Sequence, residues 1–167
     1  MKSPNKVLAI ARIPNDIVVP RFKNIGITLV LDKIRDPGNL GTIIRLCDWF
    51  GVRQIICSLD TVDMFNPKVI QATMGSAFRV KILYKNLSKY LSTINEPIYG
   101  ACIKGADLKE SSPINNFHLI IGNESNGISK NNLKFVTKKI AIEARDSSVD
   151  SLNVAVATAI LLYEFTS

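Results

Sequence analysis

Hydrophobic positions along this chain fall into short β-branched runs that alternate with amphipathic stretches. The run Gly26 to Ile34 is almost wholly apolar, as expected for a strand that is covered on both faces of a sheet. Asp36-Pro37-Gly38 interrupts this run, and Leu40 to Phe50 then shows the spacing of a helix that ends at Gly51. A buried strand followed by a helix is the first unit that the pattern predicts.

The rest of the chain continues the same order of strands and helices. Further strands are predicted over Gln54–Ser58, Arg79–Tyr84, Pro97–Ile103, Phe117–Ile121 and Lys139–Ile142. Further helices are predicted over Asn66–Met74, Asn86–Ile94, Ser129–Val136 and Ser151–Phe165, with a connecting loop over Lys104–Asn116. Strands that alternate with helices predict an α/β fold with a parallel sheet and helices on both faces.

The composition is that of a globular protein. Of its 167 residues, 47% are hydrophobic and 21% charged, which suits one domain with a substantial core. The longest apolar run, Val154 to Tyr163, is too short to span a bilayer, and the first residues lack the apolar core of a signal peptide. Cys47, Cys57 and Cys102 lie far apart inside apolar runs, which predicts buried reduced thiols. We therefore expect a cytoplasmic protein with no membrane contact and no metal.

The chain is basic. It has 21 Lys and Arg against 14 Asp and Glu, a formal net charge of +7 and a pI near 9.4. Such a charge favours a polyanionic partner such as RNA through contacts to phosphate, yet a lysine bias of the source genome would produce the same excess. The strip Arg79, Lys81, Lys85 and Lys89 likewise fits either an RNA contact or a solvated face.

Three polar motifs stand at the boundaries of predicted elements. DPGNLGTIIR spans Asp36 to Arg45, LIIGNESNG spans Leu119 to Gly127, and DSLNVAVATAILLYE spans Asp150 to Glu164. Ligands of open α/β sheets bind at the carboxyl ends of the strands. The motifs therefore predict one site at that edge of the sheet.

The first motif offers an amide and a guanidinium. Asn39 is predicted near the N-cap of its helix, because Pro37 and Gly38 form a turn before it. Arg45 projects from an otherwise apolar helical stretch, so it is either a surface residue that reaches water or a side chain held in a cleft.

The other two motifs offer a carboxylate, a hydroxyl and a second amide. Glu124 lies between Gly122 and Gly127 in a turn, where it is either held at the sheet edge or simply exposed. Ser151 is predicted at the helix N-cap, with Asn153 one turn inside the helix. Capping alone would explain the serine, whereas two polar residues before a long apolar helix indicate a site.

Three further residues are interpreted as structural. His118 is the only histidine and lies inside a predicted strand, where a packed side chain is the expected role. Trp49 and Phe50 end a predicted helix and are expected in the core, in preference to a platform that stacks on bases.

The three motifs, in this order and at about this separation, resemble those of the SpoU (TrmH-like) class of SPOUT RNA ribose 2′-O-methyltransferases. The resemblance spans roughly residues 25 to 165. It implies methyl transfer from S-adenosylmethionine to a ribose 2′-hydroxyl of ribosomal or transfer RNA, a deep trefoil knot in the C-terminal third, and a homodimer whose interface completes the active sites. Residues 25–167 would form the catalytic domain, and residues 1–24 an arm or the remnant of a substrate-binding domain.

The resemblance also implies roles for individual residues. Those that match catalytic positions are Asn39, Arg45, Glu124, Ser151 and Asn153. Those that match cofactor-binding positions are Ala101, Gly122, Asn123, Gly127, Ile140, Ile142, Ser151 and Leu152. Arg45 would orient phosphate and stabilise developing alkoxide charge, since a guanidinium is almost never deprotonated and is a poor general base.

One segment departs from the family pattern. Before the third motif the family usually has Ile-Pro-Met and then a glycine, whereas this chain has Ile140-Ala141-Ile142 followed by EARDSSVD. Asp146, Ser147 and Ser148 in this longer loop suggest an adaptation to substrate. The departure leaves open an RNA-binding or assembly protein that keeps the fold without turnover. An ordinary Rossmann nucleotide enzyme would need an early GxGxxG, which this sequence lacks.

Overall fold

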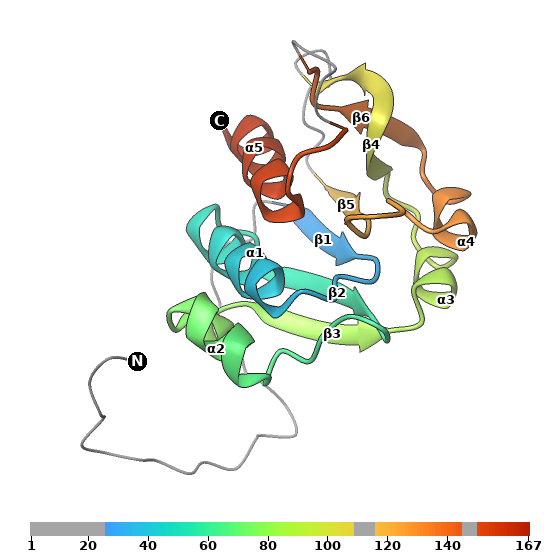
Figure 1. Ribbon diagram of the computed structural model, residues 1–167. Helices are drawn as coiled ribbons and strands as arrows, with labels where there is room; N and C mark the ends of the chain where they lie inside the picture. Colours follow the sequence, from blue (N-terminus) through green and yellow to red (C-terminus); the bar gives the residue numbers. More distant parts are fainter. Residues whose placement is uncertain (1–25, 109–115, 145–149) are drawn as a thin grey trace, which may run out of the picture.

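The computed structural model describes residues 26–108, 116–144 and 150–167 (Figure 1). Six strands form one parallel sheet in the order β3-β2-β1-β5-β4-β6. The strands are β1 (Ile27–Leu31), β2 (Gln54–Ser58), β3 (Lys81–Lys85), β4 (Ile98–Asp107), β5 (Phe117–Ile121) and β6 (Lys138–Ala141). The helices are α1 (Pro37–Trp49), α2 (Pro67–Thr73), the 3-10 turn η1 (Ser76–Phe78), α3 (Leu87–Leu91), α4 (Lys130–Leu133) and α5 (Val154–Thr166).

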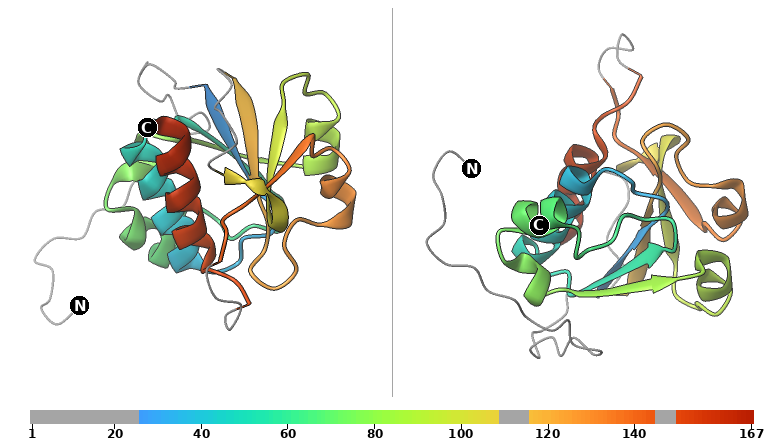
Figure 2. Two further views of the ribbon diagram at one scale, coloured as in Figure 1. Left: turned by 90° about the horizontal axis from the view of Figure 1, so that it is seen from above. Right: turned by 60° about the horizontal axis from the view of Figure 1, so that its bottom comes forward.

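The helices cover both faces of the sheet, as the alternating pattern predicts. Figure 2 shows α1, α2 and α5 on one face and α3 and α4 on the other. Successive residues of a strand point to opposite faces, so Leu29 and Leu31 lie in the larger hydrophobic cluster while Val30 lies in the smaller one. Strands β1, β2, β4 and β5 contribute buried residues to both clusters, which explains why these strands read as continuous apolar runs.

The order of the strands reverses beside β1. From β1 the chain proceeds to β2 and then β3 on one side, whereas β5, β4 and β6 lie on the other side. The amide of Asp32 donates to the carbonyl of Ile121 at 2.9 Å, so the loops that follow β1 and β5 start side by side. This reversal point is where open α/β sheets bind their ligands.

Strand β4 is longer than predicted, and the loop predicted from Lys104 was wrong in its first part. Ala101 and Ala106 both lie opposite Ile140 of β6, so the four residues between them form a bulge and pairing resumes after it. Lys104 and Gly105 in this bulge read as the start of a loop, although the strand continues through them. Residues 109–115, the later part of the predicted loop, lie outside the described residues.

Helix α1 begins three residues before the predicted start. Asp36 is its N-cap, and the carboxylate of Asp36 accepts the backbone N–H of Asn39 at 2.7 Å. Pro37 occupies the first helical position, where a missing N–H costs least. Asn39 therefore lies in the first turn of the helix and not at its cap.

Trp49 was wrongly expected in the core. It is 83% exposed at the C-terminal end of α1, whereas Phe50, the next residue, is partly buried and packs against the core. The expectation failed because the core-facing side of α1 carries Leu40, Ile44 and Cys47, and Trp49 follows on the outward side.

His118 is a packed residue, as predicted. It is buried in β5, and its Nε2 lies 2.8 Å from the hydroxyl of Tyr90. Burial lowers the pKa of His118, and the nearby carboxylate of Glu96 opposes this effect only in part. The imidazole is thus neutral at physiological pH and part of the packing of β5 against α3.

The cysteines are free thiols. Cys47 and Cys57 are buried, and burial raises the pKa of Cys57 to about 12 and that of Cys47 further. Cys102 is partly exposed, so the prediction of burial holds fully for two of the three. Within the ranges that the structure describes, no helix is long and apolar enough to cross a membrane.

Candidate active site

Side chains from all three sequence motifs meet at the carboxyl edge of the sheet. Asn39 Nδ2 donates to Glu124 Oε1 at 2.7 Å, and Asn153 Nδ2 donates to Asn39 Oδ1 at 3.1 Å. These hydrogen bonds join positions that are 85 and 114 residues apart in the chain. Asn39, Glu124 and Asn153, which we call the amide–carboxylate cluster, therefore confirm that the motifs converge.

The loop after β5 holds the carboxylate in place. Asn123 and Gly127 exchange two backbone hydrogen bonds, of 3.0 and 2.8 Å, which close the loop around Glu124. Asn123 Nδ2 also donates to Glu124 Oε2 at 3.2 Å and to the carbonyl of Lys33 at 3.0 Å. Both oxygens of the Glu124 carboxylate thus accept an amide N–H, although the side chain remains exposed.

The two glycines of this loop have different roles. A Cβ atom on Gly122 would lie 2.0 Å from the carbonyl carbon of Gly127, so Gly122 is required for the loop to pack on itself. Gly127 has a φ of +62°, and a Cβ atom there would meet nothing within 4 Å. Close approach of a ligand to the backbone is therefore possible at Gly127, whereas at Gly122 the space is filled by the loop.

Asn153, and not Ser151, caps α5. Asn153 Oδ1 accepts the backbone N–H groups of Ala155 and Val156 at 2.9 and 3.3 Å. The prediction that Ser151 caps the helix was wrong, because the helix begins at Val154 and its N-cap lies two residues later than predicted. Serine and asparagine are nearly equal as caps, so residue type alone did not separate the two positions. Ser151 lies exposed in the segment just before the cap.

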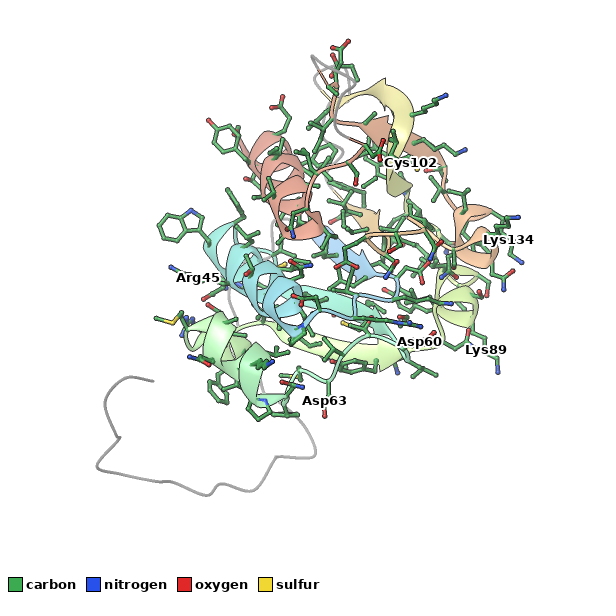
Figure 3. The ribbon with its side chains drawn as sticks, viewed as in Figure 1. Arg45, Asp60, Asp63, Lys89, Cys102 and Lys134 are labelled. Atoms are coloured by element: carbon green, nitrogen blue, oxygen red, sulfur yellow. The ribbon has the colours of Figure 1, made fainter. Side chains whose placement is uncertain are left out.

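Arg45 lies outside the amide–carboxylate cluster. It is six residues beyond Asn39 in α1, a separation of about 9 Å along the helix axis. Its side chain is exposed, and Figure 3 shows it pointing outward at the far end of α1. Within one chain, the structure therefore brings together three of the predicted catalytic residues and leaves Arg45 apart.

Most of the predicted cofactor-binding residues lie in or just after β4, β5 and β6, which are neighbours in the sheet, and Ser151 and Leu152 lie just before α5. Ala101 lies opposite Ile140, and both are level with the end of β5. The Ile140 side chain is fully buried in the core, so only its backbone could face a ligand, whereas Ile142 is partly buried and Leu152 is 49% exposed. Residues 145–149, which include Asp146, Ser147 and Ser148, lie outside the described residues.

The chemistry available at this edge is that of hydrogen bonding. One carboxylate and several amides can orient a hydroxyl group, and the backbone around Gly127 can approach a ligand closely. Across residues 26–108, 116–144 and 150–167, no group of three His, Cys, Asp or Glu residues is placed to hold a metal ion. The amide and carboxylate groups of the cluster are therefore suited to hold reacting groups in a fixed orientation.

Two residues that support the site were not singled out from the sequence. Asp36 caps α1, and the Asp-Pro pair at a helix start is a signal that could have identified it. The carbonyl of Lys33 fixes Asn123, and Lys33 has a φ of +63°. No sequence signal marks Lys33, since lysine rarely adopts this conformation.

Comparison with known proteins agrees with the fold and the motifs. The SpoU rRNA Methylase family matches residues 26–163. A 23S rRNA (guanosine(2553)-2′-O)-methyltransferase, RlmP of Bacillus subtilis, is 31% identical over 97% of this chain and 65% of its own length. A 23S rRNA (guanosine-2′-O-)-methyltransferase, RlmB of Blochmanniella floridana, is 37% identical over 84% of this chain and 57% of its own length.

The chain thus spans about three fifths of the length of these relatives. Among solved structures, a TrmH-family protein from Porphyromonas gingivalis superposes with a TM-score of 0.79 and 40% identity, over 89% of this chain and 62% of that one. An AdoMet-bound rRNA methyltransferase from Sinorhizobium meliloti superposes with a TM-score of 0.78 and 30% identity, over 89% of this chain and 57% of that one. The family expectation from the three motifs is confirmed, and the chain belongs to the SpoU rRNA methylase family.

Proposed function

We propose that this chain is the catalytic part of an S-adenosylmethionine-dependent enzyme that methylates a ribose 2′-hydroxyl of RNA. The observation that carries the proposal is the amide–carboxylate cluster, in which Asn39, Glu124 and Asn153 from three distant motifs share hydrogen bonds at the reversal point of the sheet. The names of the two curated relatives favour 23S ribosomal RNA over transfer RNA as the substrate.

The residues around the cluster fit the methyl donor. S-adenosylmethionine has apolar and polar parts, and it supplies a methyl group on a positively charged sulfur. The partly exposed side chains of Ala101, Ile142 and Leu152 offer apolar surface, and the open space at Gly127 lets the backbone approach the ligand. Asn123, in the loop after β5, and Ser151, next to Leu152 in the chain, would complete the proposed donor site.

The amide–carboxylate cluster would arrange the acceptor. Methyl transfer needs the ribose hydroxyl in line with the departing sulfur, and fixed amides provide that orientation. Glu124 would accept the hydrogen bond of the hydroxyl, because its carboxylate is held from both sides by Asn39 and Asn123. Asn153 fixes the orientation of Asn39 in turn. The ribose hydroxyl would therefore be oriented by side chains that do not have to move during the reaction.

A homodimer would bring Arg45 to a site. Three exposed apolar residues of α5 recur at the spacing of one helix face, Val156, Ile160 and Tyr163, and the exposed Leu152 lies just before the helix. Trp49 extends this apolar stripe onto the adjoining helix α1, and Arg45 lies four residues before it. A second copy that covers the stripe would receive Arg45 near its own cluster, which explains why Arg45 lies away from Asn39 of the same chain.

Three finer features belong to the same proposal. A deep trefoil knot is supported by membership of the family and by the return of the chain from β6, at one edge of the sheet, to α5 beside α1. A cytoplasmic location is supported by the free cysteines. Residues 25–167 would be the catalytic domain, and residues 1–24 an arm or the remnant of a substrate-binding domain.

The proposal is tested by transfer of a labelled methyl group. The protein is incubated with methyl-labelled S-adenosylmethionine and with ribosomal or transfer RNA from cells that lack it, and the 2′-O-methyl positions are then mapped. We expect label at one ribose of ribosomal RNA. RNA binding without donor binding would instead identify the non-catalytic assembly protein that the altered loop after Ile142 leaves open.

A further inference from the structure

A cavity lies on the opposite face of the sheet from α1 and α5. It measures 280 Å³ and lies between the carboxyl ends of β1, β2 and β3 and the segments that begin α3 and α4. Its walls include Asp32, Lys33, Ser58, Asp60 and Lys85. This volume is just below that of small-ligand sites, which start at about 300 Å³, and it suits one small planar group.

A buried carboxylate with one unused oxygen lines this cavity. Asp32 is only 1% exposed, and its Oδ2 accepts the backbone N–H of Ser129 at 2.8 Å and Asn132 Nδ2 at 3.0 Å. Its other oxygen, Oδ1, has no hydrogen-bond partner among the described residues. Because a buried carboxylate oxygen without a donor is costly, the geometry favours a ligand that brings N–H groups to this position.

A single residue, Asn123, connects the wall of the cavity to the amide–carboxylate cluster. Lys33 forms part of this wall, while the carbonyl of Lys33 accepts Asn123 Nδ2, which also donates to Glu124. The amide of Lys33 is fixed as well, because it donates to Ser58 Oγ at 2.9 Å. A group bound in the cavity would therefore lie beside a hydroxyl held by Glu124, as a base lies beside its ribose.

Charge at the rim suits a nucleotide. Lys33 and Lys85 line the cavity, and lysine side chains at the rim can contact phosphate. Lys33 Nζ pairs with Asp60 Oδ2 at 3.6 Å, with about half of each side chain exposed. Exposed ion pairs of this kind are weak, so Lys33 can leave Asp60 to contact a phosphate. Figure 3 shows Asp60 on the side of the molecule that carries Lys89, away from Arg45.

We propose that this cavity binds the guanine base of the nucleotide to be methylated, with its N–H groups directed at Asp32 Oδ1. Among the four RNA bases, guanine alone carries two adjacent N–H donors on its Watson–Crick edge, and a carboxylate oxygen accepts from such donors. The inference rests on the proposed function, since it assigns the base whose ribose is presented to Glu124.

Nucleotide binding tests the inference without a need for methyl transfer. The full chain is titrated with guanosine, inosine and adenosine 5′-monophosphates, and backbone amide shifts are followed by NMR. We expect guanosine monophosphate to bind roughly tenfold more tightly than adenosine monophosphate, with inosine monophosphate between them because it lacks the 2-amino group. Shifts should concentrate at Lys33 and Ser129. Equal affinities, or shifts confined to other surfaces, would overturn the assignment.

Asp32→Asn is the matched variant. Its oxygen can keep the bonds to Ser129 and Asn132, while an NH₂ group replaces the unused oxygen. The variant should lose the preference for guanine, because a donor would then face the donors of the base. Asp60→Asn removes the same charge from the rim and should retain the preference. The comparison of the three nucleotides on the wild-type chain decides the question even if Asp32→Asn fails to fold.

The nucleotide titration also separates this inference from the proposed function. If guanosine monophosphate binds selectively but no RNA is methylated, the proposed function fails and the guanine site stands. If RNA is methylated but the three monophosphates bind alike, the guanine site fails and the methyltransferase stands.

Discussion

The carboxamide of Asn39 is hydrogen bonded at both ends, to Glu124 through Nδ2 and to Asn153 through Oδ1. A side chain that donates in one direction and accepts in another can adopt only one orientation of its amide. The orientation of Asn39 therefore sets that of the Glu124 carboxylate. No other residue type of similar size supplies a donor and an acceptor in this geometry, which explains why an asparagine suits this position.

Asn39→Asp tests this arrangement with an almost isosteric change. The new carboxylate would face Glu124 Oε1, now 2.7 Å from Asn39 Nδ2, and the two negative charges would repel each other. We expect kcat for RNA methylation to fall roughly 100-fold, as on removal of a single oriented donor, while the thermal midpoint changes little because the site is exposed. Asn95→Asp, at an exposed position away from the site, is the control and should retain activity.

The sequence predicted the positions of the cluster residues but not what supports them. Asn39, Glu124 and Asn153 could be placed at one edge because each adjoins an element boundary in an alternating fold. The support from Lys33 could not be predicted. It depends on the backbone carbonyl of a residue in the left-handed conformation, which lysine rarely adopts. The pattern of residue types does not show which backbone groups will form hydrogen bonds.

At the scale of elements, the start of α5 combines stability and function in one side chain. Asn153 accepts two backbone N–H groups of the helix through Oδ1 and donates to Asn39 through Nδ2. Serine can accept the same N–H groups, but it has no side-chain amide to donate to Asn39 Oδ1. The two roles of Asn153 can thus be separated by substitution.

Asn153→Ala should lower both stability and activity, whereas Asn153→Ser should lower activity alone. Loss of a cap costs about 1 kcal/mol, and serine caps nearly as well as asparagine. Urea unfolding and single-turnover methyl transfer are to be measured on both variants. Equal stability of the alanine and serine variants would contradict the capping role, and normal turnover of the serine variant would contradict the role of the link to Asn39.

A second contact between elements predicts how stability depends on pH. Asp48 of α1 accepts hydrogen bonds from Arg53 Nη1 and Arg79 Nε, each at 2.7 Å. Burial alone would raise the pKa of Asp48, but the hydrogen bonds from Arg79, Ser76 and Arg53 outweigh burial and lower it. A lowered pKa in the folded state means that this carboxylate stabilises the fold above its unfolded pKa of about 3.9, and that the stabilisation is lost as the pH falls through the folded pKa.

Asp48→Asn should therefore lower the free energy of unfolding at pH 7 by about 1.5–3 kcal/mol, the contribution of hydrogen bonds to charged groups. The difference from the wild type should shrink as the pH falls below about 4, because the wild-type carboxylate is then protonated as well. Urea unfolding at pH 7 and near pH 3 measures both quantities. Asp63→Asn is a control at an exposed acidic residue, and its effect on stability should be small at either pH.

At the scale of the whole molecule, periodicity predicted the layers but not the order of the strands. Alternating strands and helices require a parallel sheet with two covered faces, and the structure has one. The pattern does not determine which strands are neighbours, because every buried strand shows the same apolar run. The adjacency of β1 and β5, on which the site depends, became expected only through the likeness of the motifs to a known family.

A homodimer with shared sites makes a prediction that a monomer cannot meet. If Arg45 acts in the site of the partner, Arg45→Ala and Asn39→Asp each retain little activity alone, but a mixed dimer contains one site with both residues intact. Co-expression of the two variants should restore about a quarter of wild-type methylation, since half of the dimers are mixed and one of their two sites is complete. S-adenosylmethionine affinity of the Arg45→Ala protein should be nearly unchanged, and its mass by ultracentrifugation should remain that of a dimer. Activity no higher than that of the separate variants would contradict a shared site. It would mean either that Arg45 and Asn39 serve the site of the same chain or that Arg45 takes no part in the reaction. The distance between the two residues would then need another explanation.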